Sequence, residues 1–147
     1  MNDVKPVEIL LVEDNPRDAE LILRALKKHD LADRVFHVID GADALDFIFT
    51  RGKYKEMKME RPLKVILLDL KLPKVSGLEV LRAIKTDEQT QTIPVVIVTS
   101  SSEDPDMQTA YELGANSYIV KPVQFDAFID AMTRLGKYWL RVNHFPR

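Results

Sequence analysis

Residues 65–77 read Val-Ile-Leu-Leu-Asp-Leu-Lys-Leu-Pro-Lys-Val-Ser-Gly, and this stretch decides the predicted fold. It begins with an apolar run that is continuous rather than alternating, which is typical of a parallel strand covered on both faces. The run ends at Asp69, and the Ser-Gly pair precedes a stretch with apolar residues at helical spacing. The segment therefore predicts a strand, a loop and a helix, with an acidic residue at the carboxyl end of the strand.

Other short apolar runs lie on both sides of this segment, and each is followed by an amphipathic stretch of helical length. The runs are Ile9 to Val12, Val35 to Ile39, Val95 to Val98 and Ser117 to Val120. Asn15 and Pro16 form a good cap and first turn for the first helix, and Gly114 is suited to end the fourth. Strand and helix repeated in this order favour an α/β fold, a doubly wound five-stranded parallel sheet with right-handed crossovers.

The composition fits one domain, which we expect to span residues 1–147 with a core from about 7 to 140. The net charge of −2 gives no reason to expect nucleic acid as a partner, and no apolar run approaches the ~20 residues that cross a bilayer. The absence of Cys excludes disulfides and Cys-ligated zinc. We therefore expect a cytoplasmic protein without a membrane or nucleic-acid partner.

Polar residues follow four of the predicted strands at the point where each strand ends. Glu13 and Asp14 follow the first strand, Asp69 the third, Thr99 the fourth and Lys121 the fifth. In an open parallel sheet, ligands bind beyond this edge. Clustered carboxylates repel one another unless a cation such as Mg²⁺ neutralises them, and a Lys beside them can hold an anion. Any one of these residues alone could be a cap or turn residue, but together they indicate phosphoryl transfer, with a carboxylate as the nucleophile.

Taken in order, these motifs resemble the receiver domain of two-component response regulators. The resemblance covers Val7 to about Tyr138. It rests on residues 9–15 (Ile-Leu-Leu-Val-Glu-Asp-Asn), residues 65–73, Ser76-Gly77, residues 93–100, Gly114-Ala115 and residues 118–122 (Tyr-Ile-Val-Lys-Pro).

The resemblance implies a role for each residue at this edge. Asp69 would be the phosphoacceptor, and Lys121 would pair with a phosphoryl oxygen. Mg²⁺ or Mn²⁺ would be held by the side chains of Glu13, Asp14 and Asp69 and by the main-chain carbonyl of Lys71. Many relatives have Asn or Met where this chain has Lys71, a position that tunes the access of water, so the lifetime of the phosphate does not follow from the resemblance.

The resemblance also implies a switch. Thr99 would hydrogen-bond the phosphoryl group and draw in the loop after the fourth strand. Tyr118 would then change rotamer and carry the signal to the face formed by the fourth helix, the fifth strand and the fifth helix. A cis peptide bond is expected between Lys121 and Pro122.

The partners implied are a histidine kinase, a downstream protein target or phosphotransfer protein, and a second copy of the chain in a homodimer. The chain would catalyse only its own phosphotransfer and dephosphorylation, without an output domain. The long basic connection from Arg51 to Arg61 and the tail Tyr138-Trp139-Leu140 resemble small regulators paired with bacterial phytochrome-type kinases. The same features also suit a surface loop and aromatic packing at the end of the fifth helix.

Three alternatives were weighed. A phosphatase of the haloacid dehalogenase type needs a second Asp two residues after its nucleophile, where this chain has Lys71. A flavodoxin-like flavin carrier needs a phosphate-binding loop after the first strand, where Glu13 and Asp14 would repel phosphate. A pseudo-receiver scaffold would not need the complete set of polar residues. Labelling of Asp69 by acetyl phosphate distinguishes these readings.

Overall fold

The computed structural model describes residues 7–28, 31–57, 63–122 and 124–144, which contain a parallel five-stranded sheet in the order β2-β1-β3-β4-β5. Three strands coincide with the predicted runs, whereas β2 ends one residue earlier and β4 one residue later. The winding order reverses between β1 and β3, and this switch point is where open α/β sheets bind ligands. The strands are β1 (Ile9–Val12), β2 (Val35–Val38), β3 (Val65–Leu68), β4 (Val95–Thr99) and β5 (Ser117–Val120).

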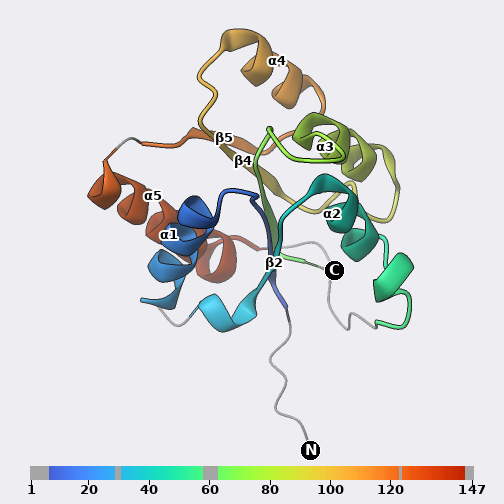
Figure 1. The fold of residues 1–147 in the computed structure, drawn as a ribbon, viewed down its shortest axis with the longest axis horizontal. Helices are drawn as coiled ribbons and strands as arrows, with labels where there is room; N and C mark the ends of the chain where they lie inside the picture. The colour runs from blue at the N-terminus through green and yellow to red at the C-terminus, as the bar shows by residue number, and fades with distance from the viewer. Residues whose placement is uncertain (1–6, 29–30, 58–62, 123, 145–147) are drawn as a thin grey trace, which may run out of the picture.

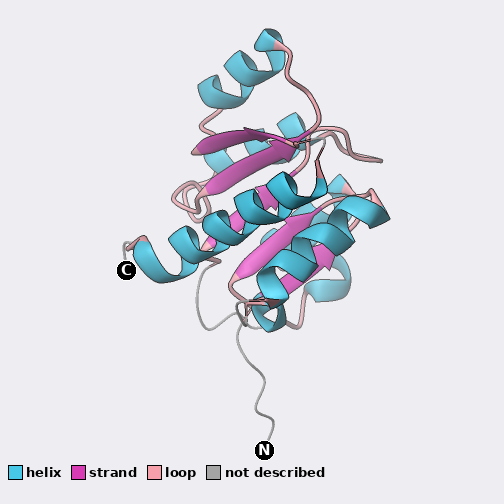
Figure 2. Ribbon diagram, turned by 90° about the vertical axis from the view of Figure 1, so that its left-hand side faces the viewer, coloured by secondary structure: helices cyan, strands magenta, loops and turns pink. Residues whose placement is uncertain are grey.

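Helices cover both faces of the sheet (Figure 1). On one face lie α1 (Pro16–Lys27) and α5 (Phe125–Lys137), which cross in front of the strands in Figure 2. On the other lie α2 (Gly41–Ile48) and α3 (Gly77–Thr86), with α4 (Asp104–Glu112) beside α3 and β5. The doubly wound α/β prediction is confirmed. Short helical turns complete the described elements: η1 (Ala32–Arg34), η2 (Gly52–Tyr54) and η3 (Tyr138–Val142).

The two-layered core explains why the strands are continuously apolar. In β1, Leu10 and Val12 pack among side chains of α2 and α3, whereas Ile9 and Leu11 pack among those of α1 and α5. All four are at most 1% exposed. Because alternate residues of a strand point to opposite faces, a strand with helices on both faces needs apolar residues at every position.

Two glycines satisfy local demands of the backbone. A Cβ on Gly77 would lie 2.1 Å from the main-chain oxygen of Asp69, so only glycine lets α3 begin against the loop that carries this carboxylate. Ser76 caps the same helix by accepting a hydrogen bond from the Glu79 N–H at 3.3 Å. Gly114 follows α4 with φ +107°, as predicted for a helix-ending glycine.

Two further expectations concern the fifth strand and the tail. The peptide bond between Lys121 and Pro122 is trans, so the predicted cis bond is wrong. It was carried over from the resemblance alone, and no local pattern in the sequence requires it. Trp139 and Leu140 pack partly buried against α1 and α5, in agreement with a packing role for the tail.

The basic connection is described only up to residue 57; its remaining residues to 61 lie outside the described part. Tyr54 packs edge-on against Phe47, and Lys53 and Arg51 pair with Asp43 and Asp46. The described part of this basic segment is therefore locally neutralised. Across the described ranges, every helix is too short or too polar to cross a bilayer.

Candidate functional site

Strand register brings the predicted site residues to one edge of the sheet. Val12 of β1 lies opposite Leu68 of β3, so the residues that follow them, Glu13 and Asp69, are neighbours. The Asp69 N–H donates to the Val12 carbonyl at 3.1 Å and fixes the first residue of the loop. On the other side, the Lys121 N–H donates to the Thr99 carbonyl at 2.7 Å.

Glu13, Asp14 and Asp69 form the acidic cluster of the site. Each offers a carboxylate oxygen, and these oxygens all lie within 4.8 Å of one another. Glu13 and Asp69 are buried at 1% and 7% exposure, whereas Asp14 is exposed. Hard divalent cations take a few carboxylate oxygens and leave other positions for water or phosphate oxygens, so this donor set fits Mg²⁺ or Mn²⁺.

The ammonium group of Lys121 lies against this cluster and contacts three carboxylates. Its Nζ lies 2.7 Å from Glu13 Oε1, 2.8 Å from Asp18 Oδ2 and 2.9 Å from Asp69 Oδ2. The Lys121 side chain is 9% exposed. Two of these partners were predicted as site residues from the sequence, and Asp18 was not.

Burial and the hydrogen bonds of Lys121 shift the pKa values of these groups. Burial, opposed by the hydrogen bond from Lys121 and reinforced by the charge of Asp69, raises the pKa of Glu13 to about 7. Burial also acts to raise the pKa of Asp69, but the hydrogen bond and charge of Lys121 outweigh it and the net shift is downward. Burial acts to lower the pKa of Lys121, but its bonds to Asp18, Asp69 and Glu13 raise it overall. Asp69 and Lys121 are thus held charged as a pair, whereas burial, with the charge of Asp69 adding to it, makes Glu13 the carboxylate that is most easily protonated.

Thr99 and Tyr118 lie on the path leading from the site to α4. Thr99 is fully buried, and its hydroxyl helps to lower the pKa of Asp69. Ser101, two residues later, accepts a hydrogen bond at its carbonyl from the Tyr118 hydroxyl at 3.0 Å. The Ser101 hydroxyl in turn donates to Asp106 in the first turn of α4 at 2.5 Å. Tyr118 is therefore connected to the loop after β4, and Ser101 is a member of this path that the sequence reading did not identify.

Lys71 and His37 complete the surroundings of the carboxylates. The Lys71 N–H lies 3.4 Å from Asp69 Oδ1, and its side chain is exposed. His37 Nε2 donates to the main-chain carbonyl of Glu13 at 2.8 Å, from the neighbouring strand β2. The role of the Lys71 carbonyl as a metal ligand stays a prediction.

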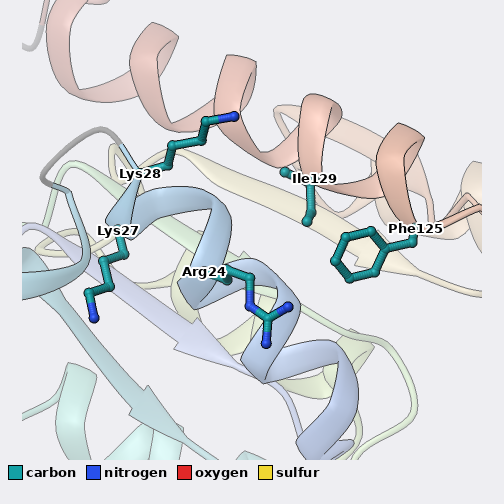
Figure 3. Close-up of a pocket in the computed structure, with 5 residues that line it drawn as sticks. All are labelled: Arg24, Lys27, Lys28, Phe125 and Ile129. Carbon is teal, nitrogen blue, oxygen red and sulfur yellow. The ribbon is translucent and has the colours of Figure 1, made fainter.

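Two depressions lie beside the site, between α1 and the amino end of α5. A hollow of about 300 Å³ is lined in part by Asp18, Ser100, Lys121 and Phe125. A groove of about 410 Å³ continues from it, and the two share Phe125. Figure 3 shows the residues of this groove: cationic side chains from α1 and its end, and apolar side chains from α5. They are Arg24, Lys27, Lys28, Phe125 and Ile129.

The sequence matches the family described as "Response regulator receiver domain" over residues 9–133. The chain belongs to this family. The matched range contains every residue placed at the acidic edge, so the predicted fold and function class are confirmed: this is a receiver domain of a two-component response regulator.

Curated relatives of this receiver domain resemble it over nearly their whole length. The probable methanogenesis regulatory protein FilR2 of Methanothrix harundinacea is 40% identical over 96% of this chain and 88% of its own. Response regulator Rcp1 of Synechocystis is 35% identical over 96% of this chain and 94% of its own. For these two relatives, the similarity therefore extends over most of the length of the relative.

Solved structures of phytochrome response regulators share the fold. The phosphorylated cyanobacterial phytochrome response regulator RcpA superposes with a TM-score of 0.89 at 34% identity, covering 97% of this chain and 100% of its own. The bacteriophytochrome response regulator RtBRR is 48% identical with a TM-score of 0.75, over 97% of this chain and 85% of its own. The Mn²⁺-bound form of Rcp1 has a TM-score of 0.87 at 34% identity, over 97% of this chain and 100% of its own. The prediction of a divalent cation as cofactor agrees with the acidic donor set and with this metal-bound relative.

Asp18 is the site residue that sequence reasoning missed most clearly. It lies four residues after Asp14, in the first turn of the helix that Asn15 caps, and this placement is one signal that could have pointed to it. An acidic residue in a first helical turn usually serves the helix end, so the pattern alone did not distinguish the two roles.

Proposed function

We propose that this receiver domain accepts a phosphoryl group on Asp69 from a histidine of a partner kinase in a reaction that depends on Mg²⁺. The observation that carries the proposal is the position of Asp69 Oδ2, 2.9 Å from Lys121 Nζ and within reach of Glu13 and Asp14. In the transfer, the bond between phosphorus and the histidine nitrogen breaks as a bond forms from an Asp69 carboxylate oxygen to phosphorus. A carboxylate needs no general base for this attack because it is already ionised, as the lowered pKa of Asp69 implies.

The other residues of the site position the phosphoryl group and help to neutralise its charge. Glu13, Asp14 and Asp69 would hold the cation, which when bound neutralises charge on the transferred phosphoryl group. Lys121, 2.9 Å from Asp69 Oδ2, would donate a hydrogen bond to a phosphoryl oxygen. Position 71 is Lys, where a phosphatase of the haloacid dehalogenase type has its second Asp, so we propose that the catalysis of this chain is limited to its own phosphorylation and dephosphorylation.

Incubation with acetyl phosphate and Mg²⁺, followed by intact mass measurement, tests the proposal. The wild type should gain one phosphoryl group, Asp69→Asn should gain none, and the exposed-site control Asp126→Asn should behave as wild type. An unlabelled wild type would support the scaffold reading instead. Steady hydrolysis of an added phosphomonoester would support the phosphatase reading.

For output, we propose a relay from Thr99 to the surface formed by α4, β5 and α5. Tyr118 already bonds the loop that follows Thr99, and Tyr111 of α4 lies 6.4 Å from its ring. Tyr111 and Val120 are large apolar residues at 52% and 37% exposure on this surface, which suits a protein contact. Thr99→Ala should abolish any phosphorylation-dependent change in partner binding or self-association, measured with and without acetyl phosphate by sedimentation; an unaltered change would refute the relay.

The partners are proposed from the relatives and from the surface. RcpA and RtBRR are phytochrome response regulators, so we propose a phytochrome-type histidine kinase as phosphodonor. The hollow that Lys121 lines shares Phe125 with the groove of Arg24 and Lys27, and we propose the kinase contact there. This chain covers 94% of the length of Rcp1. We therefore propose that residues 1–147 act as one receiver domain. Its output would be a contact with another protein, which is a downstream target, a phosphotransfer protein or a second copy of the chain. A cytoplasmic location stays a prediction.

A further inference from the structure

The ammonium group of Lys121 has three carboxylate partners, and it donates hydrogen bonds to two of them, Asp18 and Asp69. A lysine ammonium group has three N–H donors and no acceptor, and here the group faces Glu13, Asp18 and Asp69 at 2.7, 2.8 and 2.9 Å. The Asp18 side chain is 24% exposed, and it reaches Lys121 from α1 across 103 positions of sequence. Asp18 is thus a direct partner of the cation that the proposed function assigns to the phosphoryl group.

The three partners of Lys121 differ in what the reaction does to them. Asp69 loses its carboxylate charge when one of its oxygens is esterified to phosphorus. Glu13 belongs to the acidic cluster that would hold the cation. Asp18 lies outside that cluster and is not esterified, so its charge is the same before and after transfer. Of the three partners, Asp18 is therefore the one that neither accepts the phosphoryl group nor belongs to the proposed cation site, and it can hold Lys121 in both states.

Without Asp18, the Lys121 side chain could adopt a conformation directed away from Asp69. The hollow of about 300 Å³ beside it is lined by Asp18, Ser100 and Phe125, among others, and leaves room for a long side chain to turn away from Asp69. Fixing a lysine side chain costs rotamer entropy, so a partner that holds it in place beforehand favours the reaction.

Asp18 itself is well fixed. Asn15 Oδ1 accepts hydrogen bonds from the N–H groups of Arg17 and Asp18 at 2.9 and 3.1 Å, which sets the first turn of α1. A carboxylate on a capped helix is a firmer anchor than one on a loop.

We infer that Asp18 is a positioning residue for phosphoryl transfer: its carboxylate holds the Lys121 ammonium group beside Asp69 before and after Asp69 is phosphorylated. The inference rests on the proposed function of Asp69 and Lys121, and it adds a residue outside the set implied by the family resemblance.

Phosphorylation kinetics with acetyl phosphate test this inference. At saturating donor and Mg²⁺, Asp18→Ala should lower the rate constant ~10-fold, whereas Asp18→Asn, which keeps an acceptor oxygen, should stay within ~3-fold of wild type. The affinity for Mg²⁺, measured by calorimetry, should change less than ~3-fold in Asp18→Ala because Asp18 is not among the proposed ligands. Glu20→Ala, which removes an exposed carboxylate from the same helix, is the matched control and should behave as wild type.

A second measurement excludes a purely structural role. In ¹H–¹⁵N spectra of the ammonium groups, the Lys121 signal, assigned with Lys121→Arg, should persist in wild type with beryllofluoride and Mg²⁺ as phosphoryl mimic and disappear in Asp18→Ala. An unchanged rate constant in Asp18→Ala, with or without a loss of stability, would overturn the inference and leave Asp18 as a helix-end charge. Equal loss in Asp18→Ala and Glu20→Ala would also overturn it, because the effect would then not be specific to the carboxylate that contacts Lys121. A wild type without label would instead refute the proposed function.

Discussion

At the carboxyl ends of β1 and β3, the carboxylates of Glu13, Asp14, Asp69 and Asp18 surround a single ammonium group, that of Lys121. At the amino end of the same sheet, the cations of the cluster outnumber its carboxylate. There Glu8, buried at 5% exposure, lies between two cations, 3.0 Å from Arg34 and 3.1 Å from Lys64. Both clusters join segments far apart in the sequence, and both bury charge.

The two clusters differ in whether their charges are balanced by the chain itself. Glu8 has a partner for each oxygen, so the protein alone satisfies it and its role is structural. At the carboxyl end the chain leaves negative charge in excess, which costs stability until a cation binds. Such an uncompensated cluster at a strand edge marks a functional site.

Removal of the balanced carboxylate should have the largest effect on stability. Glu8→Ala leaves Arg34 and Lys64 without their partner, although both cations are about one-third exposed and can be hydrated again. We expect the free energy of unfolding to fall by about 3 kcal/mol in urea titrations. Labelling of Asp69 by acetyl phosphate should be unchanged at temperatures where the variant is folded. A parallel loss of labelling in the folded variant would show that the two ends are not independent.

Addition of Mg²⁺ should stabilise the protein through the unbalanced end alone. At 100 times its dissociation constant the expected gain in unfolding free energy is about 2.7 kcal/mol, measured in wild type by thermal unfolding. Glu8→Ala should gain as much as wild type, whereas Asp14→Asn should gain much less at the same concentration. An equal gain in Asp14→Asn would place the cation elsewhere.

In the absence of divalent cations, removal of one negative charge from the acidic cluster should increase the stability of the folded protein. Glu13→Gln should raise the unfolding free energy at pH 8 by about 1–2 kcal/mol. The pKa of Glu13 is about 7 in the folded protein against 4.5 unfolded, so the folded state binds the extra proton. The stability that this proton contributes is present below pH 4.5 and is lost as the pH rises to about 7.

The stabilisation by Glu13→Gln should therefore be full at pH 8 and small at pH 4.5, in denaturant titrations with a chelator present. If the variant were instead less stable than wild type at pH 8, the bond from Glu13 to Lys121 would outweigh the cost of burying the Glu13 charge near Asp69, and the contrast between the two ends would fail.

The smallest effect on stability is expected for an ion pair whose side chains are exposed to solvent. Glu20 and Arg24 form an exposed pair on α1 with N–O distance 2.9 Å, and their side chains are 69% and 56% exposed. Arg24→Ala should change the unfolding free energy by less than about 0.5 kcal/mol. A loss comparable to that of Glu8→Ala would mean that burial is not what separates strong from weak ion pairs in this protein.

Local patterns were enough to predict most of the fold and the centre of the site. The run Val65–Leu68 is apolar at every position because helices cover both faces, and this is visible in four consecutive residues. Asp69 and Lys121 could be predicted because a residue that directly follows a strand of a parallel sheet must lie at its carboxyl edge. The cap at Asn15 and the turn at Gly114 are likewise local requirements of the backbone.

Other features depend on how distant parts of the chain meet in three dimensions, and the spacing of residues along the sequence could not predict them. The trans bond before Pro122 contradicts an expectation that came from the resemblance, not from the residues themselves. The bond from the Tyr118 hydroxyl to Ser101 depends on a rotamer, which the sequence does not specify. The pairing of Glu8 with Arg34 and Lys64 joins residues that precede three different strands, and none of them stands out in the sequence.

The sequence by itself determined the strands, the helix ends and the acidic edge, because each depends on a few neighbouring residues. Only the tertiary structure decided which charges meet. Asp18 contacts Lys121, 103 positions away in the chain, because α1 packs against α5, the helix that follows β5. Hydrophobic periodicity places elements on a face of the sheet, but the distance between two side chains depends on how those elements pack together.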